Sequence, residues 1–104
     1  MAWVYLLIAG LLEIVWAYSM KLSSGFTQIG ASVVTIAAML MSFGLLAVAM
    51  KSLPLGTAYT VWTGIGAVGS FAVGIIVLGE AVTATRLLAA TLILAGLALM
   101  KLSS

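Results

Sequence analysis

The sequence predicts an all-α membrane protein, a bundle of four transmembrane helices that makes one membrane domain of residues 1–104. Two observations lead to this prediction. Hydrophobic residues make up 65% of the chain and charged residues 6%, with a mean hydropathy of +1.39, which is too apolar for a water-facing surface. A helix needs about 20 apolar residues to cross the bilayer, so this length allows four crossings and no soluble domain.

The first two apolar runs are separated by a polar turn. We expect the first helix at about residues 3–20, ending near Lys21, and the second at about residues 29–50. Pro54 follows the second run closely and cannot continue a helix in that register. The sequence therefore predicts a tight turn before the third helix. Met1 and its neighbours lack the positive charge of a signal peptide, so we expect the first helix to be retained.

The last two helices are expected at about residues 55–78 and 85–102. Arg86 and Lys101 lie at the ends of the fourth run, where their charged groups can reach the lipid headgroups. The runs lack the sustained polar alternation of a membrane β-barrel. Loops this short predict antiparallel neighbouring helices.

The residue types that are missing exclude several kinds of site. The chain has no cysteine and no histidine, which excludes disulfides, thiolate chemistry and zinc-type sites. The formal net charge of +2 is too small and too scattered for nucleic-acid binding. We therefore expect no metal site, no cofactor, no nucleic-acid partner and no enzymatic activity.

The basic residues give no clear instruction about orientation in the membrane. With four crossings, Lys51 and Lys101 lie on one side and Lys21 and Arg86 on the other. Because the balance of Lys and Arg in short loops sets topology, this tie predicts insertion in both orientations. The alternative is that another factor fixes one orientation. Insertion in both orientations would permit an antiparallel homodimer, in which two copies supply an inverted repeat.

Small residues in the fourth helix would let two helices approach closely, although such residues occur in any packed bundle. The candidates for a dimer interface are Ala89, Ala95 and Gly96.

Glu13 is the strongest functional candidate. It is the only acid within a predicted span, and no basic residue lies within helical reach. An acid at a helix centre costs roughly 2.5 to 3.5 kcal/mol on insertion scales and usually faces a pathway or a proton relay. Desolvation favours the protonated form and a nearby cation favours the ionised form, so protons and a cation would compete for Glu13. The alternative is a protonated carboxyl that only holds two helices together.

Polar and aromatic residues of three predicted helices could surround Glu13. Hydroxyl and indole N–H groups in an apolar setting need acceptors, and a carboxylate is a strong one. For Tyr59 and Trp62, interfacial anchoring or core packing is an equal alternative. The candidates for this site are Gly10, Trp16, Ser42, Tyr59, Trp62 and Thr63.

The stretch at residues 64–69 spells GxGxxG but does not indicate a nucleotide site, because no strand precedes it and it lies inside an apolar run. Gly64 and Gly66 are candidates for a hinge in the third helix, with close helix packing as the alternative.

The whole chain resembles the small multidrug resistance family. The matching features are Glu13, the Met20-Lys21 pair with GFT at residues 25–27, and AYTVWTGIG at residues 58–66. Trp16 and the run at residues 61–69 look like the guanidinium-exporter subtype. The resemblance implies a proton-coupled exporter in the cell inner membrane that works as an antiparallel dimer.

The same resemblance implies that Glu13 of both protomers binds substrate or protons, and that Trp16, Ser42, Tyr59 and Trp62 form a hydrogen-bond network around the two carboxylates. Guanidinium chemistry fits this site independently. Its N–H groups pair two at a time with a carboxylate, and its faces stack on aromatic rings.

Other functions remain open from the sequence. A broad-specificity exporter of quaternary ammonium or lipophilic cations would need Met39 and Phe43 to yield as a portal between protomers. A small dual-topology ion channel and a membrane scaffold without transport activity are alternatives of a different class.

Overall fold

A computed structural model describes residues 1–103, which form four helices: α1 (Ala2–Leu22), α2 (Ile29–Ala49), α3 (Leu55–Ile76) and α4 (Ala84–Leu102). Each helix is long and apolar enough to cross a membrane. The all-α fold with four spans, predicted from composition, is confirmed. The observed helices begin or end within two residues of the expected ranges, and the largest differences are at the ends of α1 and α3.

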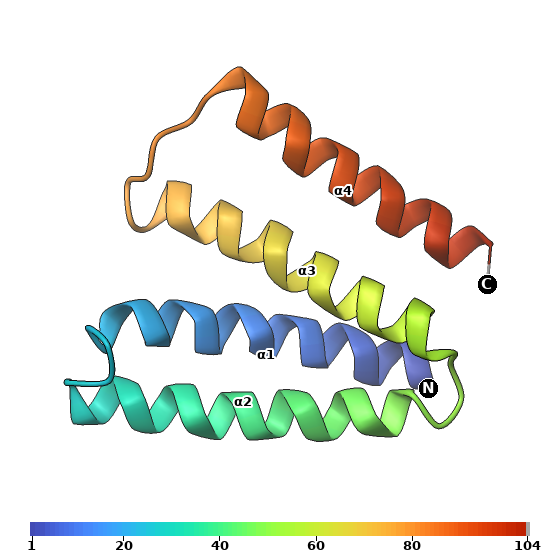
Figure 1. The fold of residues 1–104 in the computed structure, drawn as a ribbon, viewed down its shortest axis with the longest axis horizontal. Coiled ribbons are helices and arrows are strands. Elements are labelled where there is room, and N and C mark those ends of the chain that lie inside the picture. The colour runs from blue at the N-terminus through green and yellow to red at the C-terminus, as the bar shows by residue number, and fades with distance from the viewer. Residues whose placement is uncertain (104) are drawn as a thin grey trace.

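The turn between α1 and α2 is organised by Ser23. Its hydroxyl donates to the Met20 carbonyl at 2.7 Å and accepts from the Phe26 backbone N–H at 3.0 Å. Ser24, Gly25 and Phe26 all have positive φ values, so the chain reverses within a few residues. The reversal places α2 antiparallel beside α1, as Figure 1 shows.

The core lies where α1, α2 and α3 converge, at the end of the molecule that holds the N-terminus and the turn between α2 and α3 (Figure 1). Small residues allow the helices to approach there, since Ala9, Ala49 and Ala58 are completely buried. Large side chains fill the remaining space, among them Leu6 and Trp62. The first three helices therefore form one packed unit at this end.

Glycines set the contact between α1 and α3. A β-carbon at Gly10 would overlap Ile65, and one at Gly69 would overlap Ile14. The two helices thus interlock, with a side chain of each against a glycine of the other. Toward the opposite end, α3 diverges from α1 (Figure 1).

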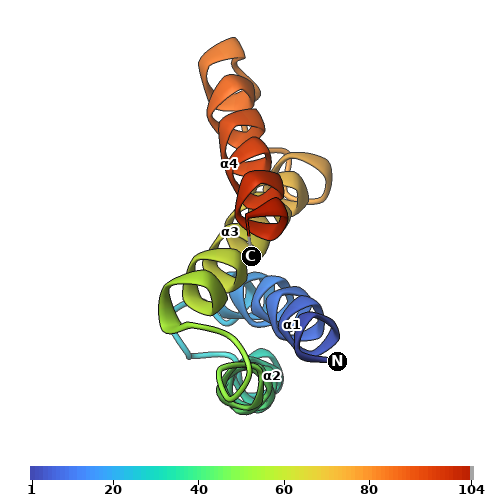
Figure 2. The ribbon, with the colours of Figure 1, turned by 90° about the vertical axis from the view of Figure 1, so that its right-hand side faces the viewer.

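The fourth helix stands apart from this unit. It packs mainly against α3 and meets α1 at one end, where the Lys101 ammonium lies 4.5 Å from the centre of the Trp3 ring, and none of its residues is fully buried. Figure 2 shows α4 beyond α3, on the side away from α1 and α2. Its first turn is capped by Thr83, whose hydroxyl accepts from the Arg86 backbone N–H at 3.1 Å. The described chain is consequently flat, with extents of 40 × 35 × 16 Å.

Candidate functional site

Glu13 lies midway along α1, on the side that faces α3. Its carboxyl group is packed against Gly66, where a β-carbon would overlap both the carboxyl carbon and Oε1. The side chain is only partly exposed, and Oε1 is buried without a hydrogen-bond partner. No lysine or arginine pairs with it in residues 1–103. Glu13 therefore presents an acceptor whose hydrogen-bonding capacity this chain leaves unused.

Three helices are joined by a short hydrogen-bond chain beside Glu13. The Trp62 indole Nε1–H donates to the Ser42 hydroxyl at 2.9 Å, and this hydroxyl donates to the Ala9 carbonyl at 2.6 Å. Ala9 is one helical turn before Glu13, so its carbonyl is the regular acceptor for the Glu13 backbone N–H. The chain from α3 through α2 thus fixes the α1 backbone at the turn that carries the carboxyl group.

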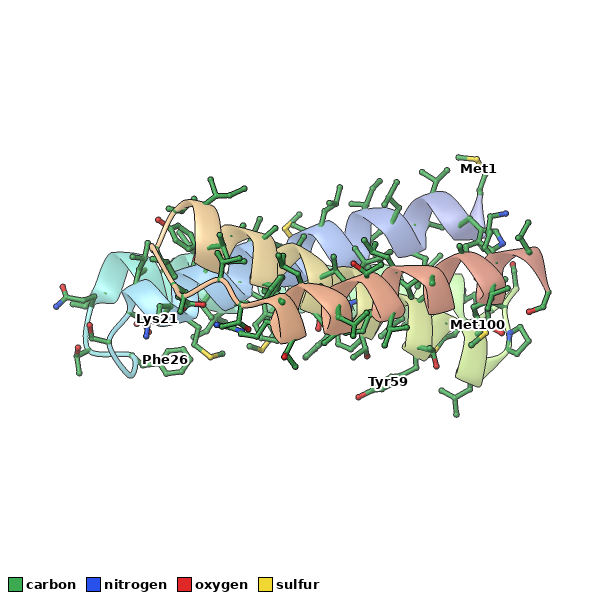
Figure 3. All side chains as sticks on the ribbon, turned by 90° about the horizontal axis from the view of Figure 1, so that it is seen from above. Met1, Lys21, Phe26, Tyr59 and Met100 are labelled. Atoms are coloured by element: carbon green, nitrogen blue, oxygen red, sulfur yellow. The ribbon has the colours of Figure 1, made fainter. Side chains whose placement is uncertain are left out.

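An aromatic row continues this link on the same three helices. Trp16 and Phe43 meet edge to face with ring centres 6.4 Å apart, and Phe43 meets Trp62 in the same way at 5.8 Å. Tyr59 follows at 5.6 Å from Trp62. Trp62 is buried, whereas Tyr59 is 53% exposed and projects away from the helices in Figure 3. The row offers ring faces to a cation at its exposed positions.

Trp16 has an indole N–H that lacks an acceptor. Its Nε1 is buried and makes no hydrogen bond, as is also true of Oε1 of Glu13 one turn earlier. Two unsatisfied groups of opposite hydrogen-bonding character on neighbouring turns are unusual in a native structure. Such groups mark a place where a ligand, water or another chain can supply the missing partner.

The structure brings some sequence candidates together and separates others. Glu13, Trp16, Ser42 and Trp62 lie along one connected set of contacts, with Phe43 between the two tryptophans. The hydrogen bonds of Ser42 and Trp62 end on the Ala9 backbone and not on the Glu13 carboxyl. A network that closes directly around the carboxylates stays a prediction.

The remaining pocket candidates have other surroundings. The Ile65 side chain fills the space beside Gly10, so Gly10 serves as a packing contact in this chain. Met39 is half-buried on α2. Thr63 is exposed and lines a groove of about 480 Å³ between α3 and α4, together with Tyr59.

The glycines proposed as a hinge have a clear packing role. Gly66 receives the Glu13 carboxyl, and a β-carbon at Gly64 would overlap Leu97 of α4. The helix is continuous through both positions. Hinge bending at these glycines remains a prediction, whereas close packing explains why glycine stands there in this structure.

The three small residues expected at a dimer interface are all exposed on α4. Ala89 and Gly96 are seven residues apart and border two grooves between α3 and α4, which Ala95 does not line. A β-carbon at Gly96 would meet nothing within 4 Å. The surface around Gly96 is open in one chain.

Two parts of the site had no sequence signal that pointed to them alone. Ala9 contributes through its backbone carbonyl, which any residue type would supply. The contact between Gly66 and Glu13 could be inferred only from the glycine spacing in α3, which also fits a hinge.

A comparison with known families shows which family the chain belongs to. The family model described as "Small Multidrug Resistance protein" matches residues 1–93. The chain belongs to the small multidrug resistance family. Membership covers α1, α2, α3 and the first half of α4, so it includes every residue of the site around Glu13.

Curated members of the small multidrug resistance family align with the whole chain. The chain is 55% identical over 104 residues to a protein named guanidinium exporter from Citrobacter freundii, covering 100% of this chain and 99% of that protein. It is 56% identical over 104 residues to a guanidinium exporter from Yersinia pseudotuberculosis, covering 100% of both. These relatives are transporters and not enzymes. Four apolar helices and this family place the chain in the cell inner membrane as a multi-pass protein.

Proposed function

We propose that this protein exports guanidinium and related small organic cations in exchange for protons. The observation that carries the proposal is the state of Glu13, an acid inside a span whose buried Oε1 has no partner. The names of relatives that are 55% identical over 104 residues support guanidinium as the substrate class.

The chemistry of guanidinium suits the groups around Glu13. A planar cation with forked N–H donors binds a carboxylate through two hydrogen bonds. The aromatic row that begins at Trp16 and Phe43 supplies rings against which the cation can lie. Because protons and the cation need the same carboxylate, the loaded site holds one or the other.

One chain does not enclose this site, since α4 packs mainly against α3 and none of its residues is buried. We propose an antiparallel homodimer in which two copies of Glu13 face each other and the protomers exchange conformations to open the site to either side. The unpaired Trp16 N–H and the exposed surface of α4 both fit a second copy. Insertion in both orientations follows from the equal Lys and Arg counts of the two ends.

The test is uptake of guanidinium into proteoliposomes with an outward or inward proton gradient. Because protons must leave as guanidinium enters, we expect saturable uptake that is driven by the outward proton gradient, is not driven by the inward one, and is lost in Glu13→Gln. Uptake of a bulky quaternary ammonium ion at a similar rate would support the broad-specificity exporter instead. Large single-channel currents would support an ion channel, and wild-type activity in Glu13→Gln would contradict any role for the carboxyl group.

A further inference from the structure

A charged cavity lies away from Glu13, between α1, α3 and the loop that joins α3 to α4. Its volume is about 350 Å³. Its lining residues include Lys21, at the end of the molecule where α3 diverges from α1 (Figure 1) and where Figure 3 labels Lys21. Ile14 and Ala67 line it near the middle of their helices, whereas its charged lining comes from helix ends and the loop.

Three charged side chains line this cavity: Lys21 of α1, Glu80 of the loop and Arg86 of α4. Both signs of charge are present, yet no ion pair joins any two of them in the part of the chain that the structure describes. Neither the Lys21 ammonium nor the Glu80 carboxylate makes a hydrogen bond to residues 1–103. The cavity therefore holds separate positive and negative groups that remain available to a ligand.

Two of the charged groups are held in place by neighbours. The Arg86 guanidinium donates from Nη1 to the Ala81 carbonyl at 2.9 Å and lies 5.1 Å from the centre of the Phe71 ring. The Glu80 carboxyl is packed against Gly74, where a β-carbon would overlap it. The loop backbone is tied to the same place, because the Glu80 N–H donates to the Gly74 carbonyl at 3.0 Å.

We propose that this cavity binds a phospholipid headgroup. The headgroup carries both a phosphate and a primary ammonium group, as phosphoethanolamine does. The phosphate lies with Lys21 and Arg86, and the ammonium group donates hydrogen bonds to Glu80. Glu80 disfavours a headgroup with negative charge alone. A quaternary ammonium headgroup has no N–H to donate to the carboxylate.

The position and the apolar lining of the cavity fit a lipid. Lys21 lies in the last turn of α1 and Arg86 in the first turn of α4, which is the depth of the headgroups for helices that span the bilayer. A second, mainly apolar cavity of about 210 Å³ lies between α3 and α4 and shares Ala67, Phe71 and Arg86 with the first. The two cavities give the acyl chains apolar surface directly beside the headgroup site.

The proposal is tested by competition among lipids for the purified full-length protein in detergent. Phosphatidylethanolamine, phosphatidylcholine and phosphatidylglycerol with identical acyl chains are added in equal amounts, and retained lipid is counted by native mass spectrometry. We expect phosphatidylethanolamine to be retained in preference to both others. Equal retention of the three, or a preference for phosphatidylglycerol, would overturn the proposal without any variant.

Variants then assign the preference to the cavity. Glu80→Gln should reduce the preference for phosphatidylethanolamine over phosphatidylcholine about tenfold, as expected for loss of a hydrogen bond to a charged group. Lys21→Gln should weaken retention of all phospholipids. The control is Lys51→Gln at the opposite end, which should leave both quantities unchanged. If Glu80→Gln keeps the preference for phosphatidylethanolamine, the headgroup is not recognised in this cavity. The proposal is independent of transport, so failure of either leaves the other standing.

Discussion

The carboxyl group of Glu13 occupies the place where a residue other than glycine at position 66 would carry its β-carbon. The missing side chain on α3 thus creates the space for the acid on α1. This makes the separation of α1 and α3 at the site sensitive to one methyl group. It also explains how a carboxyl can be partly buried between two helices that pack closely on either side of it, at Gly10 and Gly69.

Gly66→Ala should displace the Glu13 carboxyl or push α3 away from α1. Overpacking of this kind typically costs about 1 to 3 kcal/mol. We expect guanidinium affinity, measured by titration calorimetry, to fall at least about tenfold, which corresponds to the lower half of that range.

The matched control is Gly56→Ala in the first turn of the same helix, where a β-carbon would meet nothing within 4 Å. It should bind as tightly as wild type. Equal affinity in Gly66→Ala would mean that the position of the carboxyl relative to α3 does not matter for binding.

Guanidinium affinity should depend on pH with a defined sign. Falling pH protonates Glu13 and removes the negative charge that attracts the cation, so binding weakens. Where the carboxyl is protonated, binding of one guanidinium displaces one proton. In that range the apparent Kd should rise about tenfold for each unit by which the pH falls. The measurement is the Kd from pH 5 to pH 9, and a constant value across this range would contradict competition.

Ser42→Ala should destabilise the contact among α1, α2 and α3. The substitution removes the link between the Trp62 indole and the Ala9 carbonyl and leaves the buried indole N–H unpaired. Hydrogen bonds between transmembrane helices average about 0.6 kcal/mol and reach about 1.7 kcal/mol, and we expect the upper part of this range. The free energy of unfolding in mixed detergent checks this value.

Ser32→Ala is the appropriate comparison, because the Ser32 hydroxyl bonds only to the Gln28 carbonyl of the preceding turn and is exposed. Its stability should match wild type. If both serine variants unfold alike, the hydrogen-bond chain beside Glu13 contributes nothing to stability.

Trp16→Phe separates ligand binding from folding. The ring contact with Phe43 can persist in the variant, while the indole N–H, which has no acceptor in this chain, is removed. Stability should therefore be unchanged or slightly higher, whereas guanidinium affinity should fall about fivefold to tenfold if the N–H orients the carboxylate or the partner copy. Loss of stability with unchanged affinity would assign Trp16 to packing alone.

Orientation in the membrane should respond to single charges. Because the two ends carry two Lys or Arg residues each, Lys51→Gln should favour chains with the Lys21 turn in the cytoplasm. The chain has no cysteine, so a single Ser24→Cys reporter gives a clean labelling signal from either side of the membrane. We expect both orientations for the reporter alone and mainly one with Lys51→Gln. A single orientation before the charge is removed would contradict dual insertion.

The helices were accessible to sequence reasoning because membrane spans are defined locally. Length and apolarity identify each crossing, and Pro54 and Gly79 mark where α3 starts and where the chain after it turns. Glu13 was identified for the same reason, since an acid within an apolar run is visible without knowledge of the fold.

Contacts between helices were not accessible in this way. The GxGxxG pattern indicated close approach or bending, but only the three-dimensional arrangement shows that Gly66 faces Glu13 and that Gly64 faces Leu97. The exposure of α4 could not be predicted either. Its mean hydropathy lies within the range of the other spans, and only the packing shows that its residues are not buried. Periodicity in a uniformly apolar helix does not reveal which face is covered.

Most side chains of α4 are exposed in the single chain, and the face turned away from α3 can change without loss of packing within the chain. Substitutions on the outer surface of α4 alter what the protein meets in the membrane, while the unit of α1, α2 and α3 keeps its interior. After gene duplication, one copy could diverge along this helix and acquire a preference for a different companion. Substitutions in α4 alone would then change which chain the protein associates with, while Glu13 stays the same.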